Sequence, residues 1–179
     1  MDLITPDKED LRRIKRLYHE AFPRVERKPF HMILCQCRKG EAELFAIQSD
    51  GGKFAGLAFI VKNADIVMLD YFAIHPKARG KGIGSQTLKL LRSRYADSRF
   101  ILEIESVDAP CRDLRELDIR QKRRRFYLNN GMIPAGFTAR VFLTDLEVLT
   151  SGKPVTFDEY RELYRSHLGE RALKKITLK

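Results

Sequence analysis

The sequence predicts an α/β (α+β) fold in which a central mixed, mostly antiparallel sheet is flanked by helices. Three observations support this. Between residues 44 and 74, apolar runs are joined by short turns, which favours an antiparallel meander. A strand–helix–strand segment follows to residue 105, and a crossover of this length places its two strands parallel. Amphipathic helices precede and follow this region. The 179 residues suit one domain, 1–179, with a core at about 3–150.

The N-terminal part predicts a short strand and two helices. Leu3 and Ile4 form the strand, and Thr5 is the expected N-cap of the first helix. Apolar residues then recur every three or four positions up to Phe22, which indicates an amphipathic helix. A second, shorter helix covers residues 29–38.

The sheet is expected to contain five further strands, at residues 44–48, 54–62, 66–74, 100–105 and 141–149. Ser49-Asp-Gly-Gly52 is a hairpin signal between the first two. A helix starts at Gly82, and a charge-rich helix ends near Asn130, with Gly131 as its left-handed cap. Thr156-Phe-Asp-Glu159 is a capping box. It opens a C-terminal helix at 155–168 that we expect to cover a sheet edge or a homodimer contact.

Residues 69–84 are the most informative segment, because an apolar strand leads there into a basic, glycine-rich turn and a helix. Pro76 cannot donate to a sheet ladder, so the strand ends before it. Gly80, Gly82 and Gly84 lack a Cβ, so several N–H groups can point at one ligand, at the positive end of the helix dipole. The segment therefore predicts a binding site for phosphate oxygens.

Two common phosphate motifs can be compared with this turn. A nucleotide-hydrolase P-loop needs Ser or Thr after its lysine, and no hydroxyl follows Lys81. A dinucleotide fingerprint would place Ser85 or Thr87 at its third glycine. An acidic residue about 20 positions further on is present, as Glu103 or Glu105, so this alternative stays open. A glycine-rich connection without a ligand stays open as well.

Arg79-Gly-Lys-Gly-Ile-Gly84 has the form Arg/Gln-x-x-Gly-x-Gly/Ala and follows an apolar strand and His-Pro. It resembles the acetyl-coenzyme A site of the GNAT superfamily of N-acetyltransferases. The resemblance implies a sheet whose parallel strand pair splays apart, and acetyl-coenzyme A as cosubstrate, with no metal. The residues implied at pantetheine are Phe72, Ala73 and Ile74. Those implied at the pyrophosphate are Arg79, Gly80, Lys81, Gly82, Ile83 and Gly84.

A second match lies at Arg125-Phe-Tyr-Leu-Asn-Asn-Gly-Met132, close to the family's Phe-Tyr-x-x-x-Gly-Phe pattern. Met132 replaces the last phenylalanine, which affects packing more than chemistry. The resemblance implies that Tyr127 lies near the coenzyme sulfur and protonates the leaving thiolate. The alternative is a core tyrosine whose hydroxyl is hydrogen-bonded within the protein.

Acetyl transfer also needs a group that removes a proton, because a primary amine with a pKa of about 10.4 is mostly protonated at neutral pH. Strand alternation places Glu103 and Glu105 on one face. Glu105 lies at the carboxyl end of its strand, where ligands of α/β crevices bind. We therefore take Glu105 as the candidate base, with Glu103 and Asp70 as alternatives.

Composition narrows the class of protein. The net charge of +10 favours anionic partners such as the coenzyme phosphates. The basic run 122–125 has no recognisable nucleic-acid module around it, so we do not expect nucleic acid as a partner. No apolar run approaches the roughly 20 residues of a membrane helix. No secretory signal is visible, and three cysteines suit a reducing compartment. We therefore expect a cytoplasmic protein that does not bind membranes.

The resulting hypothesis is an N-acetyltransferase in which an amine attacks acetyl-coenzyme A directly, in a ternary complex. The alternative is a non-catalytic module that binds acyl-coenzyme A as a sensor or scaffold. The acceptor stays open, as a small-molecule or peptide amine. In the resemblance, the segment joining the first two helices forms one wall of the acceptor site. Its weaker candidates are Phe22, Arg24 and Arg27.

Overall fold

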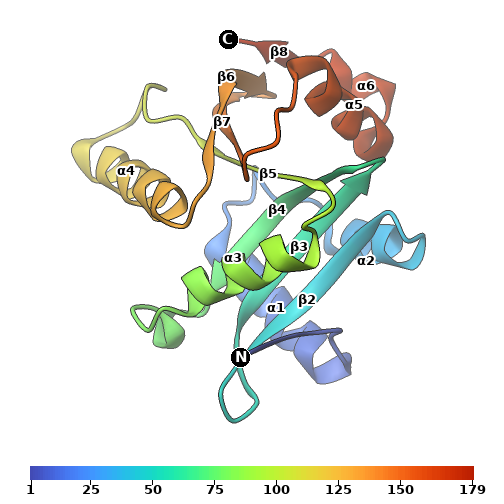
Figure 1. The fold of residues 1–179 in the computed structure, drawn as a ribbon, viewed down its shortest axis with the longest axis vertical. Coiled ribbons are helices and arrows are strands. Elements are labelled where there is room, and N and C mark those ends of the chain that lie inside the picture. Colours follow the sequence, from blue (N-terminus) through green and yellow to red (C-terminus); the bar gives the residue numbers. More distant parts are fainter. The chain divides into compact units, whose positions relative to one another are not determined.

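The computed structural model describes every residue from Met1 to Lys179 (Figure 1). The strands are β1 (Asp2–Ile4), β2 (Ala42–Ser49), β3 (Lys53–Asn63), β4 (Ile66–Ile74), β5 (Arg99–Glu105), β6 (Ile133–Val141), β7 (Thr144–Thr150) and β8 (Ile176–Leu178). The helices are α1 (Lys8–Ala21), α2 (Phe30–Arg38), α3 (Ile83–Arg94), α4 (Leu114–Asn129), α5 (Phe157–Leu168) and α6 (Glu170–Leu173).

The strand order is β1-β2-β3-β4-β5-β7-β6-β8, with one parallel pair, β4 and β5. This confirms the predicted mixed, mostly antiparallel sheet. The chain divides into two compact units. The first comprises Met1–Lys62 and Leu69–Arg94, and the second comprises Asn63–Met68 and Tyr95–Lys179. The prediction of one domain over 1–179 stays a prediction.

In the first unit, β1 pairs antiparallel with β2, and β2 with β3. The turn between β2 and β3 has Gly51 and Gly52 at φ of 80° and 72°, a backbone region that favours glycine, so the predicted hairpin is confirmed. The N–H of His75 donates to the carbonyl of Ala55 at 2.8 Å, which ties the end of β4 to the start of β3.

The first helix begins later than predicted. The carboxylate of Asp7 accepts hydrogen bonds from the N–H groups of Glu9 and Asp10, both at 2.8 Å. Asp7 is therefore the N-cap, and the prediction of Thr5 was wrong. A carboxylate gains more than a hydroxyl here, because it also meets the positive end of the helix dipole.

In the second unit, β7 pairs antiparallel with both β5 and β6, and β6 pairs with β8. The prediction of one strand at 141–149 was wrong. Two strands, β6 and β7, meet at a tight turn in which Phe142 has a φ of 55°. That left-handed backbone is uncommon for a large side chain. Because the turn contains neither glycine nor asparagine, the sequence contained no signal for it.

The helix ends of the second unit follow the sequence signals. The side chain of Asp113 accepts from the N–H of Glu116 at 2.8 Å and caps α4, and Gly131 follows that helix at a φ of 78°. Thr156 and Glu159 form the predicted capping box of α5. The short elements α6 and β8 were not predicted. No helix of the chain combines the length and the apolar character that a membrane crossing requires.

Candidate functional site

The glycine-rich turn lies between β4 and α3, in the first unit. A single 3-10 turn at Pro76–Ala78 follows β4, and Nδ1 of His75 accepts from the N–H of Lys77 at 3.3 Å. His75 thus caps this turn. Gly80 and Gly82 both have a φ of 74°. Any other residue would be strained at these two positions, so the sequence has glycine where the backbone turns toward the helix.

The N–H groups of this turn are not used by the turn itself. The first hydrogen bond within α3 runs from the N–H of Gln86 to the carbonyl of Gly82, at 3.0 Å. The N–H groups of residues 83–85 therefore precede any helical acceptor. The last bond of the preceding 3-10 turn is donated by Arg79, and the N–H groups of residues 80–82 form no backbone bond in the turn. A run of donors from 80 to 85 is left for a ligand.

Positive side chains surround these donors. Nε of Arg79 donates to the carbonyl of Ile74 at 3.0 Å, which fixes the side chain although the residue is exposed. Lys77 and Lys81 are also exposed, and no acidic side chain forms an ion pair with any of the three. Their charge adds to the positive end of the α3 dipole. The turn is therefore electrostatically suited to a phosphate or pyrophosphate group.

The strand before the turn is fitted closely to its neighbour. Phe72 and Ile74 of β4 are half-buried and Ala73 is buried. A Cβ on Gly56 of β3 would lie 2.3 Å from the carbonyl oxygen of Ala73, so only glycine allows this approach. Our sequence reasoning missed Gly56. The available signal was an isolated glycine inside an otherwise apolar strand, which indicates close approach of another backbone.

Asp70 lies on the same strand, and its carboxylate faces the segment between α1 and α2. Nζ of Lys28 is 2.6 Å from Oδ2 of Asp70. Beside this ion pair, the hydroxyl of Tyr71 donates to the carbonyl of Glu26 at 2.7 Å and accepts from the N–H of Lys28 at 3.1 Å. Burial, with the nearby charge of Asp70, raises the pKa of Tyr71 far above its usual value. Burial also raises the pKa of Tyr18 to about 12.

The other two candidate bases lie in the second unit, and both are engaged. One oxygen of Glu105 lies 3.4 Å from Arg120 and the other lies 3.3 Å from Arg123. The carboxylate of Glu103 accepts from the hydroxyls of Tyr160 at 2.6 Å and Tyr164 at 2.7 Å. A base at position 105 would have to release a guanidinium group before it took a proton.

Tyr127 lies on α4 and is 8% exposed. Burial raises the pKa of its hydroxyl to about 12, although Arg123 acts in the opposite direction. The hydroxyl takes part in none of the side-chain hydrogen bonds of α4, unlike a core tyrosine with a fixed partner. Because its pKa is about 12, the hydroxyl of Tyr127 is protonated at neutral pH, which is the form that a general acid needs. Met132, the departure from the family pattern, is 1% exposed and serves packing.

The basic run 122–125 is largely neutralised within the second unit. Lys122 pairs with Asp118 at 2.5 Å, Arg123 pairs with Glu105, and Arg124 pairs with Glu147 at 2.8 Å. The pairs of Arg123 and Arg124 join α4 to β5 and β7, whereas the pair of Lys122 lies within α4. No group of three or more His, Cys, Asp or Glu side chains is arranged to hold a metal ion.

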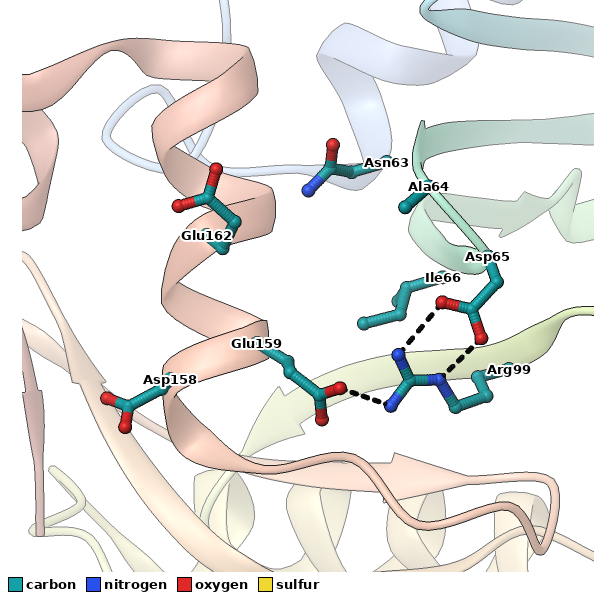
Figure 2. Close-up of a pocket in the computed structure, with 8 residues that line it drawn as sticks. All are labelled: Asn63, Ala64, Asp65, Ile66, Arg99, Asp158, Glu159 and Glu162. Carbon is teal, nitrogen blue, oxygen red and sulfur yellow. Dashed lines mark hydrogen bonds and ion pairs between the residues drawn. The ribbon is translucent and has the colours of Figure 1, made fainter.

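The second unit also contains a cavity of about 380 Å³ (Figure 2). Its lining residues are Asn63, Ala64, Asp65, Ile66, Arg99, Asp158, Glu159 and Glu162. Figure 2 shows the guanidinium of Arg99 between Asp65, at 2.8 Å, and Glu159, at 2.6 Å. This ion-pair network ties the turn before β4 to α5. None of the predicted coenzyme or catalytic residues lines the cavity.

Comparison with protein families gives one match, to the Acetyltransferase (GNAT) family, over residues 11–116. The chain belongs to the GNAT acetyltransferase family. The match covers the glycine-rich turn and both strands of the parallel pair, and it confirms the predicted family and enzyme class. It ends before Tyr127.

Solved GNAT structures have the same fold. A putative GNAT-family acetyltransferase from Bacteroides thetaiotaomicron has a TM-score of 0.71 at 16% identity, with 96% of this chain and 98% of that chain covered. The spermidine N-acetyltransferase from Vibrio cholerae, in complex with CoA and spermine, has a TM-score of 0.65 at 13% identity, with 83% and 93% covered. A comparison with curated proteins found no match.

Proposed function

We propose that this GNAT-family protein transfers an acetyl group from acetyl-coenzyme A to an amine by direct attack in a ternary complex. The observation that carries the proposal is the run of N–H groups from 80 to 85, which the turn leaves unused beside the cations of Arg79 and Lys81. Fixed donors at a helix N-terminus bind phosphate oxygens with little reorganisation. The coenzyme complex of the Vibrio cholerae enzyme, which shares the fold, supports the choice of ligand.

In this proposal the coenzyme follows the chain from β4 into the turn. Pantetheine lies along Phe72, Ala73 and Ile74. The pyrophosphate is held by Arg79, Gly80, Lys81, Gly82, Ile83 and Gly84. The fit of β3 to β4 at Gly56 supports this, because it fixes the backbone of Ala73. A backbone that is fixed before binding loses little entropy when the coenzyme pairs with it.

The chemistry then needs three events. The neutral amine attacks the thioester carbonyl, a tetrahedral oxyanion forms, and the carbon–sulfur bond breaks to give N-acetylated product and coenzyme thiolate. We assign the proton for the thiolate to Tyr127, whose hydroxyl is protonated at neutral pH. We assign removal of the amine proton to Glu105, after it releases Arg120 or Arg123. Backbone N–H groups of the strand would stabilise the oxyanion.

The proposed acceptor is a small-molecule amine, which the spermine bound by the Vibrio cholerae enzyme supports. A cytoplasmic location, where acetyl-coenzyme A is available, remains part of the proposal, as does a homodimer. Three cysteines without disulfide partners are consistent with a reducing compartment.

Calorimetric titration with coenzyme A, followed by thioester turnover on a panel of amines, tests this function. We expect saturable binding of coenzyme A and turnover that Tyr127→Phe and Glu105→Gln reduce without weakening coenzyme binding. Absence of coenzyme binding would overturn the proposal. Binding without turnover on any amine would instead favour an acyl-coenzyme A sensor or scaffold.

A further inference from the structure

The segment between α1 and α2 places the ammonium group of Lys28 beside a carboxylate and two aromatic rings. Nζ of Lys28 lies 2.6 Å from the carboxylate of Asp70, and the two side chains are only 14% and 8% exposed. The same ammonium lies 5.9 Å from the ring centroids of both Phe59 and Tyr71. A carboxylate combined with aromatic faces is the usual way in which proteins bind alkylammonium groups. The residues thus form an ammonium site that the chain itself fills.

The backbone of Lys28 is held independently of its side chain. The hydroxyl of Tyr18 donates to the carbonyl of Lys28 at 3.1 Å, and the N–H of Lys28 donates to the hydroxyl of Tyr71 at 3.1 Å. The rings of Tyr18 and Phe22 pack edge-on against Tyr71, with centroids 4.8 and 4.9 Å away. The side chain of Lys28 can therefore leave Asp70 while the segment keeps its position.

The site adjoins the proposed coenzyme strand. Asp70 precedes Phe72 by two residues on β4, so the two side chains lie on one face about 7 Å apart along the strand. Lys28 is the cation paired with Asp70, and a carboxylate as buried as this one needs a cation in its place whenever Lys28 moves out. The group that best replaces a lysine ammonium is another primary ammonium.

We propose that Asp70, with the rings of Phe59 and Tyr71, binds the primary ammonium group of the acceptor, and that Lys28 occupies this site in its absence. The inference rests on the proposed acetyl transfer. It assigns the acceptor to the primary alkylammonium class. It also makes Lys28 an internal competitor, since every acceptor has to displace it before it binds.

Chemical rescue of a shortened Lys28 tests the site without any acetyl transfer. Lys28→Ala leaves the buried carboxylate unpaired and should lower the Tm by about 6 °C or more. We expect n-propylamine, which restores the three missing methylene carbons and the ammonium, to recover much of that loss, and n-propanol to recover none. Lys28→Met serves if the alanine variant does not fold, with the ammonium ion as the probe, because methionine lacks only the charged end of lysine.

Two controls separate a site from a general salt effect. Lys62→Ala removes one of two cations from Glu43, which lies 3.0 Å from Lys62 and 3.0 Å from Arg94, so Glu43 stays paired and the variant should show no amine-specific recovery. In Lys28→Ala/Asp70→Asn the carboxylate is gone, so n-propylamine should no longer raise the Tm. Equal recovery by n-propanol, or recovery in these controls, would overturn the proposal.

Steady-state kinetics connect the site to the acceptor. Removal of the competitor in Lys28→Ala should lower the KM for primary alkylamines about tenfold. Asp70→Asn should raise it about tenfold or more. The KM for acetyl-coenzyme A should stay unchanged in both. If the wild type acetylates amines but neither KM for the amine changes, the inference fails while the acetyltransferase stands. If no amine is acetylated, the proposed function fails, and rescue of the Tm by n-propylamine alone decides whether the ammonium site exists.

Discussion

The glycine-rich turn of the first unit and helix α4 of the second unit are both rich in positive charge, but they use it differently. On α4, Lys122, Arg123 and Arg124 all form ion pairs within their own unit. At the turn, Arg79 and Lys81 have no acidic partner, and the N–H groups from 80 to 85 have no acceptor in the turn.

The difference teaches that a run of cations does not by itself mark a binding site. Charges that are paired within the fold are already stabilised and have little to offer a ligand, whereas unused donors retain their full capacity. By the same criterion, Tyr127 differs from its neighbours on α4, because its hydroxyl takes part in none of their bonds. The comparison predicts function at the turn and at Tyr127, and structural roles for the α4 cations.

The largest effect is expected at Tyr127. Removing the hydroxyl in Tyr127→Phe should lower kcat by about 10²- to 10⁴-fold, the range for loss of a general acid. The coenzyme Kd and the Tm should change little, because the hydroxyl has no partner to lose. Single-turnover kinetics with calorimetry separate these effects. An unchanged kcat would show that this unpaired hydroxyl is not catalytic.

The pH dependence of kcat tests the acid role of Tyr127 further. The pKa of Tyr127 is raised from 10.0 to about 12, so the protonated form is favoured in the folded state. The stability that this group contributes is complete below pH 10 and is lost as the pH rises from 10 to 12. An acid role for Tyr127 therefore predicts no decline in kcat below pH 10 that depends on this residue. A decline near pH 8 that disappears in Tyr127→Phe would contradict the assignment.

Glycine substitutions test the turn with a matched control. Gly82→Ala and Gly52→Ala place alanine at φ values of 74° and 72°, so both cost about 1–2 kcal/mol of backbone strain. Only Gly82 lies in the proposed coenzyme site, and there the strain should raise the coenzyme A Kd about tenfold. Calorimetry measures both variants. An equal Kd for the two would remove the special role of the turn.

Much of the sheet could be predicted because its turns carry local signals. The hairpin at 49–52 has two glycines, and the capping residues of α4 and α5 are the types that bind free N–H groups. The turn at Phe142 was not predicted, because neither Phe142 nor Leu143 is a residue type that indicates a left-handed backbone. The conformation of Phe142 is stabilised by a residue distant in the sequence, because its N–H donates a hydrogen bond to the carbonyl of Lys175 at 2.8 Å. A contact so distant in the chain leaves no local pattern.

The shape of the glycine-rich turn could be predicted for the same reason, since proline, cations and glycines stand within a few residues of each other. The partners of the carboxylates were not. Glu105 meets two arginines of α4, and Asp70 meets Lys28 from the segment after α1. Periodicity assigns such residues to a face of a strand but cannot say which long side chain from another element reaches them. Gly56 is an intermediate case. The sequence contained a local signal for it, but that signal was a single glycine with no other residue to support it.

A smaller effect is expected where β3 supports β4, the strand that we propose to hold pantetheine. Gly56→Ala forces a methyl group against the carbonyl of Ala73, which should destabilise the fold by about 1–3 kcal/mol. Because the displaced backbone is the one proposed to meet pantetheine, the Kd for coenzyme A should rise more than the Kd for 3′,5′-ADP, which lacks pantetheine. Denaturation and calorimetry give the two quantities. Equal losses for both ligands would show that β4 does not hold the pantetheine arm.

The smallest effect is expected when a single cation is removed, and it compares Lys81 of the turn with Arg124 of α4. Lys81→Gln should raise the coenzyme Kd only about threefold, since an exposed cation contributes less than 1 kcal/mol, and should make binding less sensitive to salt. Arg124→Gln removes an equal charge from α4 and breaks the pair with Glu147, so it should lower stability slightly and leave the salt dependence of binding unchanged. Titrations at two ionic strengths distinguish the outcomes. If both variants changed the salt dependence equally, net charge rather than unpaired donors would govern coenzyme binding.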